Sequence, residues 1–214
     1  QLVMNEYLLH SILEKNFLKD ARAWKNYRDY RPMVEFVKSN KLDLICANAP
    51  IRYTNLAGRK GQWVLMELPE ESKKYFAPLP YDTAEGKYYE KLTSVTHDTS
   101  GTKDTINKQT IMPPMNIFSM VIGQSLWDAT MAFSIARYFD GQPEKKILHV
   151  NGRFHSDEGF AVVTQLKKYS PNIRPLIISC GPDESFSSGN IEWSKFSHLG
   201  DYIIITDPKL PKTF

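Results

Sequence analysis

The apolar residues of the first part of the chain change their spacing twice, and each spacing predicts an element. Apolar residues recur at helical intervals over residues 2–17, so we expect one helix there. The same spacing predicts a second helix over residues 29–40. A short continuous apolar run at residues 42–47, broken by Asn48 and Pro50, predicts a buried strand.

The second half of the chain alternates helical and strand-like patterns. Helical spacing is sustained over residues 116–140, enough for about six or seven turns, and returns over residues 157–169. Nearly continuous apolar runs predict strands at residues 145–150, 174–180 and 202–208. This alternation is typical of a parallel sheet covered on both faces, so we expect a three-layer α/β fold with a mainly parallel sheet.

Residues 53–115 have a different character from the rest of the chain. They are rich in Gly, Pro, Thr and charged residues, with brief helical pieces at residues 69–75 and 85–92. A segment of this length inside an α/β chain is usually a lid or an insertion, and its part over residues 96–110 has the composition of a disordered stretch. We therefore expect one domain over residues 1–214 with a helical, lid-like insertion at 53–115.

Composition and charge exclude some functions. The chain is 42% hydrophobic and 24% charged, which is ordinary for a protein with a real core. A net charge of +3 with scattered basic residues argues against a nucleic-acid partner. No run of about 18 apolar residues predicts a transmembrane segment. The two cysteines, Cys46 and Cys180, lack the spacing of a zinc site and are expected to be small apolar strand residues.

The ends of the predicted strands are the expected place for a ligand. Open α/β sheets bind ligands beyond the carboxyl ends of their strands. Those ends lead into residues 48–52, 151–155, 180–183 and 206–208. If the strands are parallel, these four sets lie along one edge of the sheet, and we expect the binding site there.

The stretch HVNGRFHSDEG, residues 149–159, contains the sharpest of these ends. Gly152 permits a tight turn or a close backbone approach. Ser156 is expected to cap a helix beginning at Asp157, whose free N–H groups would seat a carboxylate or phosphate. His155 lies beside that seat and either contacts a ligand or only completes the turn. His149, inside the predicted strand, is expected to be a hydrogen-bonded core histidine.

The long predicted helix carries a stripe that passes from polar to apolar residues. The stripe has the spacing i, i+4, i+7 and i+11 and consists of Gln124, Asp128, Met131 and Ile135. A carboxylate near the core needs partners, because burying it unpaired is costly. Asp128 could orient an imidazole such as His155, pair with Arg52 or Arg31, or make a structural ion pair on a partly solvated face.

These positions combine into one geometric hypothesis. We expect the turns that carry Asn48 and His155 to open onto one shared hollow, facing the polar stripe of the helix that carries Asp128.

Three stretches in this order carry a family resemblance. They are YRPMVEFVKSNKLDLICANAPIRY, GQSLWDATMAFSIARYF and ILHVNGRFHSDEG. Together they resemble the ChaN-like family of haem-binding, iron-regulated lipoproteins, which shares a superfamily with Tiki and erythromycin-esterase-like proteins. The likeness runs from Tyr30 to about Leu166.

The resemblance implies a parallel α/β sheet with an inserted helical lid, and haem as the cofactor. It also implies a homodimer that holds two haems face to face, with an outer-membrane haem receptor as a possible partner. Iron would be bound by a tyrosine assisted by a histidine. No motif maps the tyrosine, so Tyr81, Tyr88 and Tyr89 are the candidates. The matching site positions are Asn48, Pro50, Arg52, Gln124, Asp128, Met131, Gly152 and His155.

One family feature has no counterpart in this sequence. The family opens with a strand bearing Gly-Glu-x-His and a second strand with an acidic residue, and both would lie upstream of Gln1. We expect that these N-terminal strands were removed or left outside this chain. A lipid anchor would have been lost with them, which implies a periplasmic or cell-envelope location.

Two functions follow from this reading. The first is a haem-binding protein of iron or haem uptake, with the ligand at the carboxyl edge of the sheet under the lid and Arg52, Arg153 or the helix start at Ser156 holding the propionates. The alternative is a hydrolase or metal-assisted peptidase that uses His155 and Asp128. A domain that kept the fold without the site is a third possibility.

Overall fold

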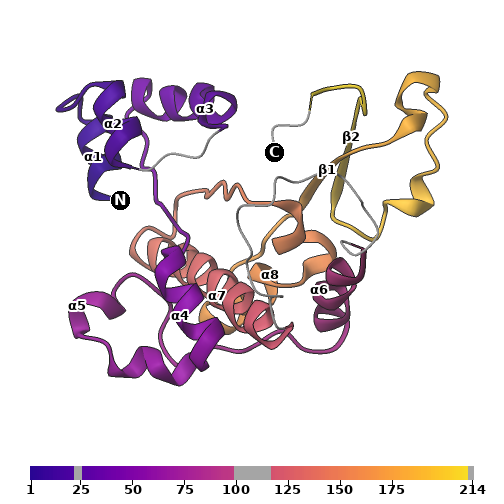
Figure 1. The fold of residues 1–214 in the computed structure, drawn as a ribbon. Coiled ribbons are helices and arrows are strands. Elements are labelled where there is room, and N and C mark those ends of the chain that lie inside the picture. Colours follow the sequence, from indigo (N-terminus) through magenta and orange to yellow (C-terminus); the bar gives the residue numbers. More distant parts are fainter. Residues whose placement is uncertain (22–25, 99–116, 212–214) are drawn as a thin grey trace, which may run out of the picture. The chain divides into compact units, whose positions relative to one another are not determined.

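A computed structural model describes residues 1–21, 26–98 and 117–211 (Figure 1). The chain separates into two compact units. Residues 1–46 and 207–214 form the smaller unit, and residues 47–206 form the larger one. The single domain over 1–214 and the lid-like role of 53–115 stay predictions.

The described part of the smaller unit contains three helices: α1 (Leu2–Leu8), α2 (Glu14–Asp20) and α3 (Tyr27–Ser39). Its core is built on Tyr7, Phe17 and Val34, and the rings of Tyr7 and Phe17 stack with centroids 4.6 Å apart. The prediction of one helix over residues 2–17 is wrong. The chain leaves α1 and passes through His10, whose φ of 58° interrupts the helix, and this break allows Tyr7 and Phe17 to face each other.

The strand predicted at residues 42–47 is also wrong, since this segment is not a strand. The side chain of Gln1 binds its backbone, because Nε2 donates to the carbonyl of Leu44 at 2.8 Å and Oε1 accepts from the amide of Cys46 at 2.7 Å. The side-chain amide of Gln1 therefore binds the backbone carbonyl of Leu44 and the backbone amide of Cys46, which a neighbouring strand would otherwise bind. Cys46 is an exposed free thiol instead of a buried strand residue.

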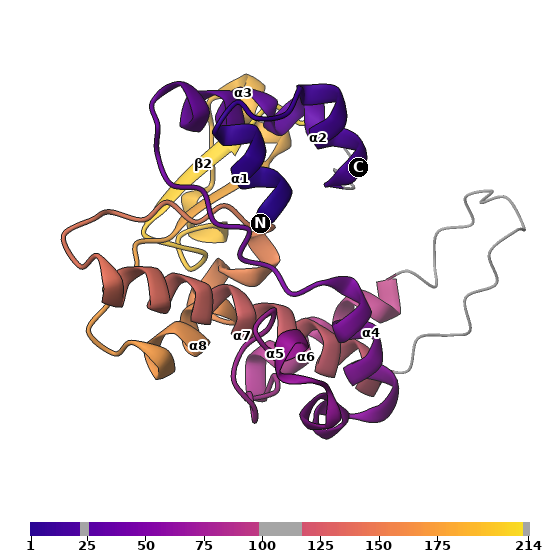
Figure 2. The ribbon, with the colours of Figure 1, turned by 90° about the vertical axis from the view of Figure 1, so that its left-hand side faces the viewer.

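The larger unit is organised around α7 (Ile117–Gly141), which confirms the long helix predicted over residues 116–140. Helices α4 (Ile51–Lys60) and α8 (Val162–Tyr169) pack against it (Figures 1 and 2). The buried residues between α4 and α7 include Ala57 and Leu126, both fully buried. Burial of this kind is the main source of stability for helices of this length.

Shorter helical pieces connect α4 to α7. They are the 3-10 helix η1 (Gln62–Glu67), α5 (Glu70–Lys73) and α6 (Gly86–Asp98). The helical pieces predicted at residues 69–75 and 85–92 are confirmed. Because α6 runs to Asp98, the first residues of the disordered stretch predicted at 96–110 are helical, and the rest of that stretch lies outside the described residues.

The sheet consists of two parallel strands, β1 (Ile178–Pro182) and β2 (Tyr202–Thr206), with Ile178 opposite Tyr202. Helices combined with a small parallel sheet are consistent with the α/β class. The strands predicted at residues 174–180 and 202–208 are both present. β1 begins later than predicted, and β2 ends earlier. Cys180 lies in β1 as predicted but is exposed. The connection between the strands contains η4 (Glu184–Ser188) and η5 (Trp193–Lys195).

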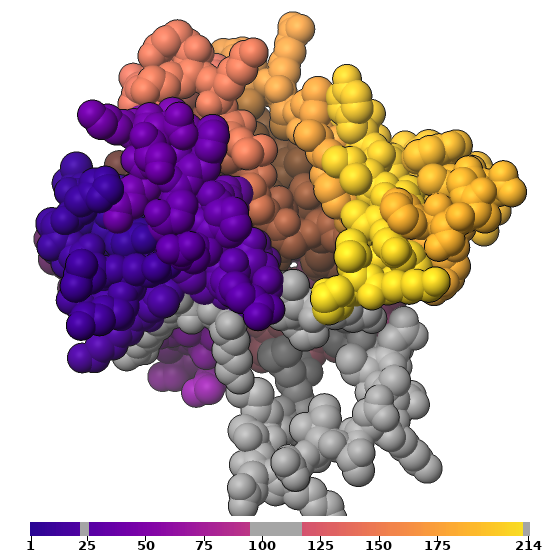
Figure 3. Space-filling view, turned by 90° about the horizontal axis from the view of Figure 1, so that it is seen from above, coloured from indigo at the N-terminus to yellow at the C-terminus, as the bar shows by residue number. Residues whose placement is uncertain are grey.

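The strand predicted at residues 145–150 is not formed. Its apolar side chains are open to solvent, since Leu148 is 79% and Val150 51% exposed. A buried parallel strand needs neighbours on both edges and cover on both faces, and in the described ranges this segment pairs with no strand. Tyr202 and Ile204 of β2 are exposed as well. Figure 3 shows the surface of this orange-to-yellow part of the chain.

The helix predicted over residues 157–169 begins later than expected. Residues 153–155 and 157–159 form two 3-10 turns, η2 (Arg153–His155) and η3 (Asp157–Gly159), and α8 starts only at Val162. Glu158 and Ala161 both have positive φ, 66° and 51°, which interrupts any helix between them. Ser156 therefore does not cap a long helix, and the anion seat expected at its start is not formed.

Candidate functional site

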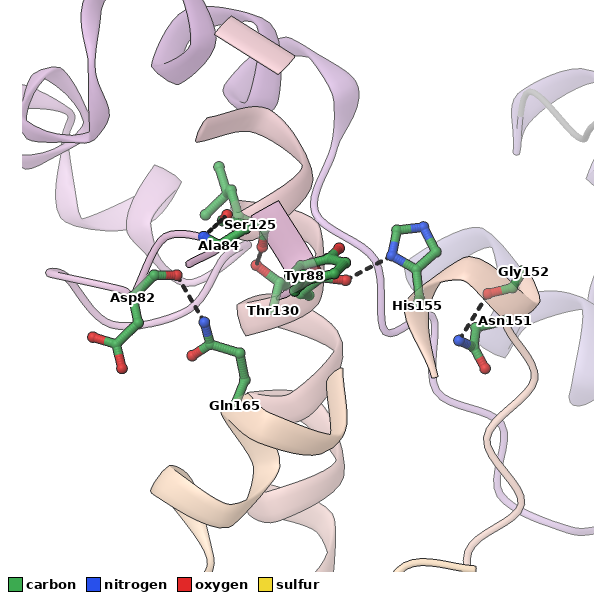
Figure 4. A network of polar contacts seen from close by, with 11 residues as sticks. Asp82, Ala84, Tyr88, Ser125, Thr130, Asn151, Gly152, His155 and Gln165 are labelled. Atoms are coloured by element: carbon green, nitrogen blue, oxygen red, sulfur yellow. Dashed lines mark hydrogen bonds and ion pairs between the residues drawn. The ribbon is translucent and has the colours of Figure 1, made fainter. Parts of the chain in front are cut away.

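The centre of the site is a contact between α7 and the turn η2. Asp128 lies on α7 and is only 1% exposed. Its Oδ1 is 2.6 Å from Nδ1 of His155 (Figure 4). Of the partners expected for Asp128, the structure therefore selects the imidazole of His155.

The two arginines considered as partners of Asp128 bind elsewhere. Arg52 is exposed, donates to the hydroxyl of Tyr53 at 3.1 Å and lies over the same ring. Arg31 pairs with Glu14 inside the smaller unit. Each guanidinium is thus paired within its own unit.

Tyr88 on α6 donates a second hydrogen bond to this carboxylate. Its hydroxyl donates to Oδ2 of Asp128 at 2.6 Å, and the ring is 8% exposed. Burial, followed by the negative charge of Asp128, raises the pKa of the Tyr88 hydroxyl above its ordinary value. The Tyr88 hydroxyl is thus used by Asp128 in this structure, and its role as an iron ligand stays a prediction.

The paired carboxylate fixes the chemistry of His155. A buried carboxylate accepts the proton of Nδ1, which leaves Nε2 as the atom with a free lone pair. Figure 4 shows this second ring nitrogen on the side of the ring away from Tyr88. The side chain is 19% exposed, so a ligand can reach it. A histidine oriented by a carboxylate is the usual form of a metal-binding imidazole, and it is also a competent general base.

Phe154, Tyr88 and Phe160 form a cluster of aromatic rings that meets this histidine through Phe154. Phe154 lies edge-on to His155, with centroids 6.1 Å apart and an interplanar angle of 90°. The ring of Tyr88 lies 5.9 Å from Phe154 and 6.3 Å from Phe160. Sequence reasoning missed both phenylalanines, although Phe154 directly precedes His155 and Phe160 follows the same loop.

Two cations border the aromatic residues. Nζ of Lys91, on α6, is 2.7 Å from Oε1 of Glu158 and lies over the ring of Phe154 at 5.6 Å. Nε of Arg153 is 2.8 Å from Oδ2 of Asp157, a carboxylate that is almost completely buried. The sequence contained a signal for Lys91, since it follows Tyr88 by three positions and must share its helix face.

The remaining stripe residues of α7 have different roles. Gln124, one turn before Asp128, has a buried Oε1 with no partner among the residues that the structure describes. Met131 is 5% exposed and packs with Val162 and Leu166 in the core between α7 and α8. Met131 is thus a packing residue in this structure, and the assignment of Gln124 and Met131 to a ligand site stays a prediction.

The turn that carries Asn48 contacts a side of α7 other than the one that carries Asp128. The carbonyl of Ala49 accepts from Nε1 of Trp127 at 3.0 Å, and Asn48 itself is exposed. Trp127 and Asp128 are consecutive and therefore point to different sides of the helix. Within the described ranges no hydrogen bond joins Asn48 to His155 or Asp128, so the structure supports only the His155 half of the shared-hollow hypothesis.

The other two tyrosines differ in exposure. Tyr81 is 2% exposed, and its hydroxyl donates to the carbonyl of Ile122 at 3.1 Å. Burial raises the pKa of its hydroxyl above the ordinary value. Tyr81 is thus a core residue whose hydroxyl is used by Ile122, and its role as an iron ligand stays a prediction. Tyr89, by contrast, is 43% exposed.

The loop before His155 contains two further corrections. A Cβ on Gly152 would lie 3.9 Å from Cδ2 of His155, which is an ordinary contact, so no close approach requires glycine there. His149 is half-buried in a segment that is not a strand, and its Nε2 has no partner among the described residues. Burial, followed by the charge of His155, lowers the pKa of His149.

The described residues contain neither a ready metal cluster nor a membrane-spanning helix. No group of three or more His, Cys, Asp or Glu side chains in those ranges is arranged to hold a metal ion. None of the helices described there has the length and apolar character needed to cross a membrane.

Comparison with known proteins gives one match. A family described as haem-binding uptake, Tiki superfamily, ChaN, matches residues 1–166. No curated protein and no solved structure matches the chain. The matched range includes α7, Tyr88 and the turn that carries His155.

Proposed function

The chain belongs to the ChaN family of haem-binding uptake proteins, and from this premise we propose that it binds haem for uptake, with Nε2 of His155 as the iron ligand. The observation that carries the proposal is the 2.6 Å contact between Nδ1 of His155 and the buried Asp128. A carboxylate on the far nitrogen orients the ring and makes Nε2 a better electron donor.

The residues present fit haem in their chemistry. Haem is a flat apolar ring with two carboxylates, and its iron takes histidine or tyrosine ligands. The ring of Phe154 lies edge-on to His155, and the ring of Tyr88 lies 5.9 Å from Phe154, so that flat apolar surface lies beside the histidine. When bound, haem would supply the iron chemistry. His155 would hold the iron, and Asp128 would hold the proton on Nδ1.

Tyr89 is the second candidate for iron binding. It is the exposed tyrosine of the three that the resemblance suggested, and it follows Tyr88 on α6. A ligand set of one tyrosine assisted by one histidine would then combine Tyr89 with His155.

A hemin titration tests the proposal. We expect the wild-type chain to give a Soret band distinct from that of free hemin. His155→Ala should abolish or strongly shift this band, whereas His198→Ala, which removes an exposed histidine, should leave it unchanged. Tyr89→Phe tests the second ligand. A wild-type spectrum identical to that of free hemin overturns the proposal.

A hydrolase is the second candidate, and the same two residues favour it. His155 oriented by Asp128 has the geometry of a general base that could activate water. Hydrolysis of an ester or peptide substrate that disappears in His155→Ala, without any spectral change on hemin addition, would favour this function.

Finer features of the family belong to the same proposal. We infer a periplasmic or cell-envelope location through a lipid anchor, a homodimer with two haems, and transfer to or from an outer-membrane receptor. We also infer that a larger, three-layer sheet covers the exposed face of β1 and β2, where Ile178, Tyr202 and Ile204 are open to solvent. Sedimentation with and without hemin tests the dimer.

A further inference from the structure

Two cations lie close to His155 along the fold: Lys91 over the ring of Phe154, and Arg153 in the same turn as His155. Each pairs with a carboxylate of the following loop. Lys91 reaches over the ring of Phe154 to pair with Glu158. Arg153 pairs through Nε with Asp157. Both cations are partly accessible, with 24% of the Lys91 side chain and 46% of the Arg153 side chain exposed.

The position of Arg153 depends on a glycine in β1. A Cβ built on Gly181 would lie 2.2 Å from Nη1 of Arg153, far inside any real contact distance. A side chain at this position would therefore displace the guanidinium from its place in this structure. The guanidinium of Arg153 therefore lies against β1 at Gly181, and its Nε pairs with the carboxylate of Asp157.

Both cations retain capacity for a second anion. An ammonium group has three donors and a guanidinium has five. Each can therefore keep its present carboxylate partner and donate to another one. Carboxylates bound in this way are held by charge-assisted hydrogen bonds, which are stronger than neutral ones.

We propose that Lys91 and Arg153 bind the two carboxylates of the ligand, so that the site selects a flat tetrapyrrole dianion over its neutral diester. This proposal rests on the proposed function, and it adds that Lys91 and Arg153 determine which tetrapyrroles the site accepts. The two positive charges match the two negative charges of haem, and the rings of Phe154 and Phe160 contact the Lys91 side chain beside the histidine.

The test uses metal-free protoporphyrin IX and its dimethyl ester, because neither needs an iron ligand. Binding is followed by porphyrin fluorescence. We expect the wild type to bind the diacid at least about tenfold more tightly than the diester, since a charged hydrogen bond contributes more than the 1.4 kcal/mol that corresponds to tenfold. Lys91→Gln and Arg153→Gln should each weaken diacid binding about tenfold and leave diester binding unchanged.

Matched variants control for charge and folding. Lys87→Gln, one turn earlier on α6, and Arg174→Gln both change exposed cations and should bind the diacid like the wild type. Gly181→Ala displaces the guanidinium of Arg153 without removing any charge, so it should weaken diacid binding even if Arg153→Gln fails to fold.

The outcomes separate the two proposals. Equal affinity for diacid and diester, or full diacid affinity in both Lys91→Gln and Gly181→Ala, overturns the carboxylate assignment. If His155→Ala still removes the hemin spectrum in that case, the proposed function stands. If the wild type binds neither hemin nor either porphyrin, both proposals fail.

Discussion

Tyr88 and Asp128 join α6 to α7 through a hydrogen bond of 2.6 Å between two buried groups. Tyr88→Phe keeps the ring but removes the donor, so that Asp128 retains only His155. We expect the free energy of unfolding to fall by about 1–3 kcal/mol, because a buried carboxylate oxygen loses its partner. Urea denaturation followed by circular dichroism measures this loss.

Tyr89→Phe is the matched control, since the Tyr89 ring is 43% exposed on the same helix. Its free energy of unfolding should stay within about 0.5 kcal/mol of the wild-type value. Equal stability of the two variants would show that the hydrogen bond to Asp128 does not hold α6 in place.

Asp128→Asn separates the charge of the carboxylate from its shape. The amide oxygen can still accept from Nδ1 of His155, but the negative charge that polarises the ring is lost. We expect the affinity for hemin to fall about 10- to 100-fold, in line with the loss of other carboxylate partners of ligating histidines. Asp140→Asn, an exposed change on the same helix, should leave the affinity unchanged. Unchanged hemin affinity in Asp128→Asn would remove the orienting role from this carboxylate.

His149 gives the stability a specific pH dependence. Burial, and then the charge of His155, lowers the pKa of His149 in the folded chain below its ordinary value of 6.5. As the pH falls through this value, the unfolded chain takes up a proton that folded His149 does not bind. The contribution of His149 is therefore fully present above about pH 6.5 and is lost as the pH falls below it.

The measurement compares denaturation midpoints of the wild type and His149→Gln between pH 5 and 8. The difference between the two should change with pH only in the acidic part of this range. His198→Gln removes an exposed histidine and should follow the wild-type curve. A pH-independent difference for His149→Gln would contradict the buried neutral state.

The helices could be predicted better than the strands because helical spacing depends on local sequence. The spacing of apolar residues predicts the long helix α7, and the brief helical piece expected at residues 85–92 corresponds to α6. The segments at 42–47 and 145–150 have strand-like composition, but a strand also needs a neighbour to pair with, and a single sequence does not contain that information. The single helix expected over residues 2–17 failed at His10, whose positive φ has no marker in the apolar pattern.

The candidate site could also be predicted only in part. The stripe position of Asp128 and the loop position of His155 predicted that they could meet, and they do. The roles of Lys91 and Phe160 depend on how α6 packs on the loop after His155, and no local pattern specifies that contact. Met131 and Tyr81 have the residue types expected of a haem site, but packing placed both in the core.

A glycine pair provides a test of the packing that supports the site. A Cβ on Gly58 of α4 would lie 2.6 Å from the backbone carbonyl oxygen of Ser119 on α7, whereas a Cβ on Gly141 would meet nothing within 4 Å. In a helix interior, alanine is favoured over glycine by about 1 kcal/mol, and less than this applies to Gly141, the last residue of α7.

Gly141→Ala should therefore leave stability unchanged or raise it by up to about 1 kcal/mol. Gly58→Ala should lower stability by about 1–3 kcal/mol, because a backbone carbonyl cannot move aside without separating α4 from α7. Thermal denaturation of the two variants gives the comparison. If Gly58→Ala is as stable as Gly141→Ala, then α4 and α7 do not approach as closely as 2.6 Å implies, and the helix that carries Asp128 is held by other contacts.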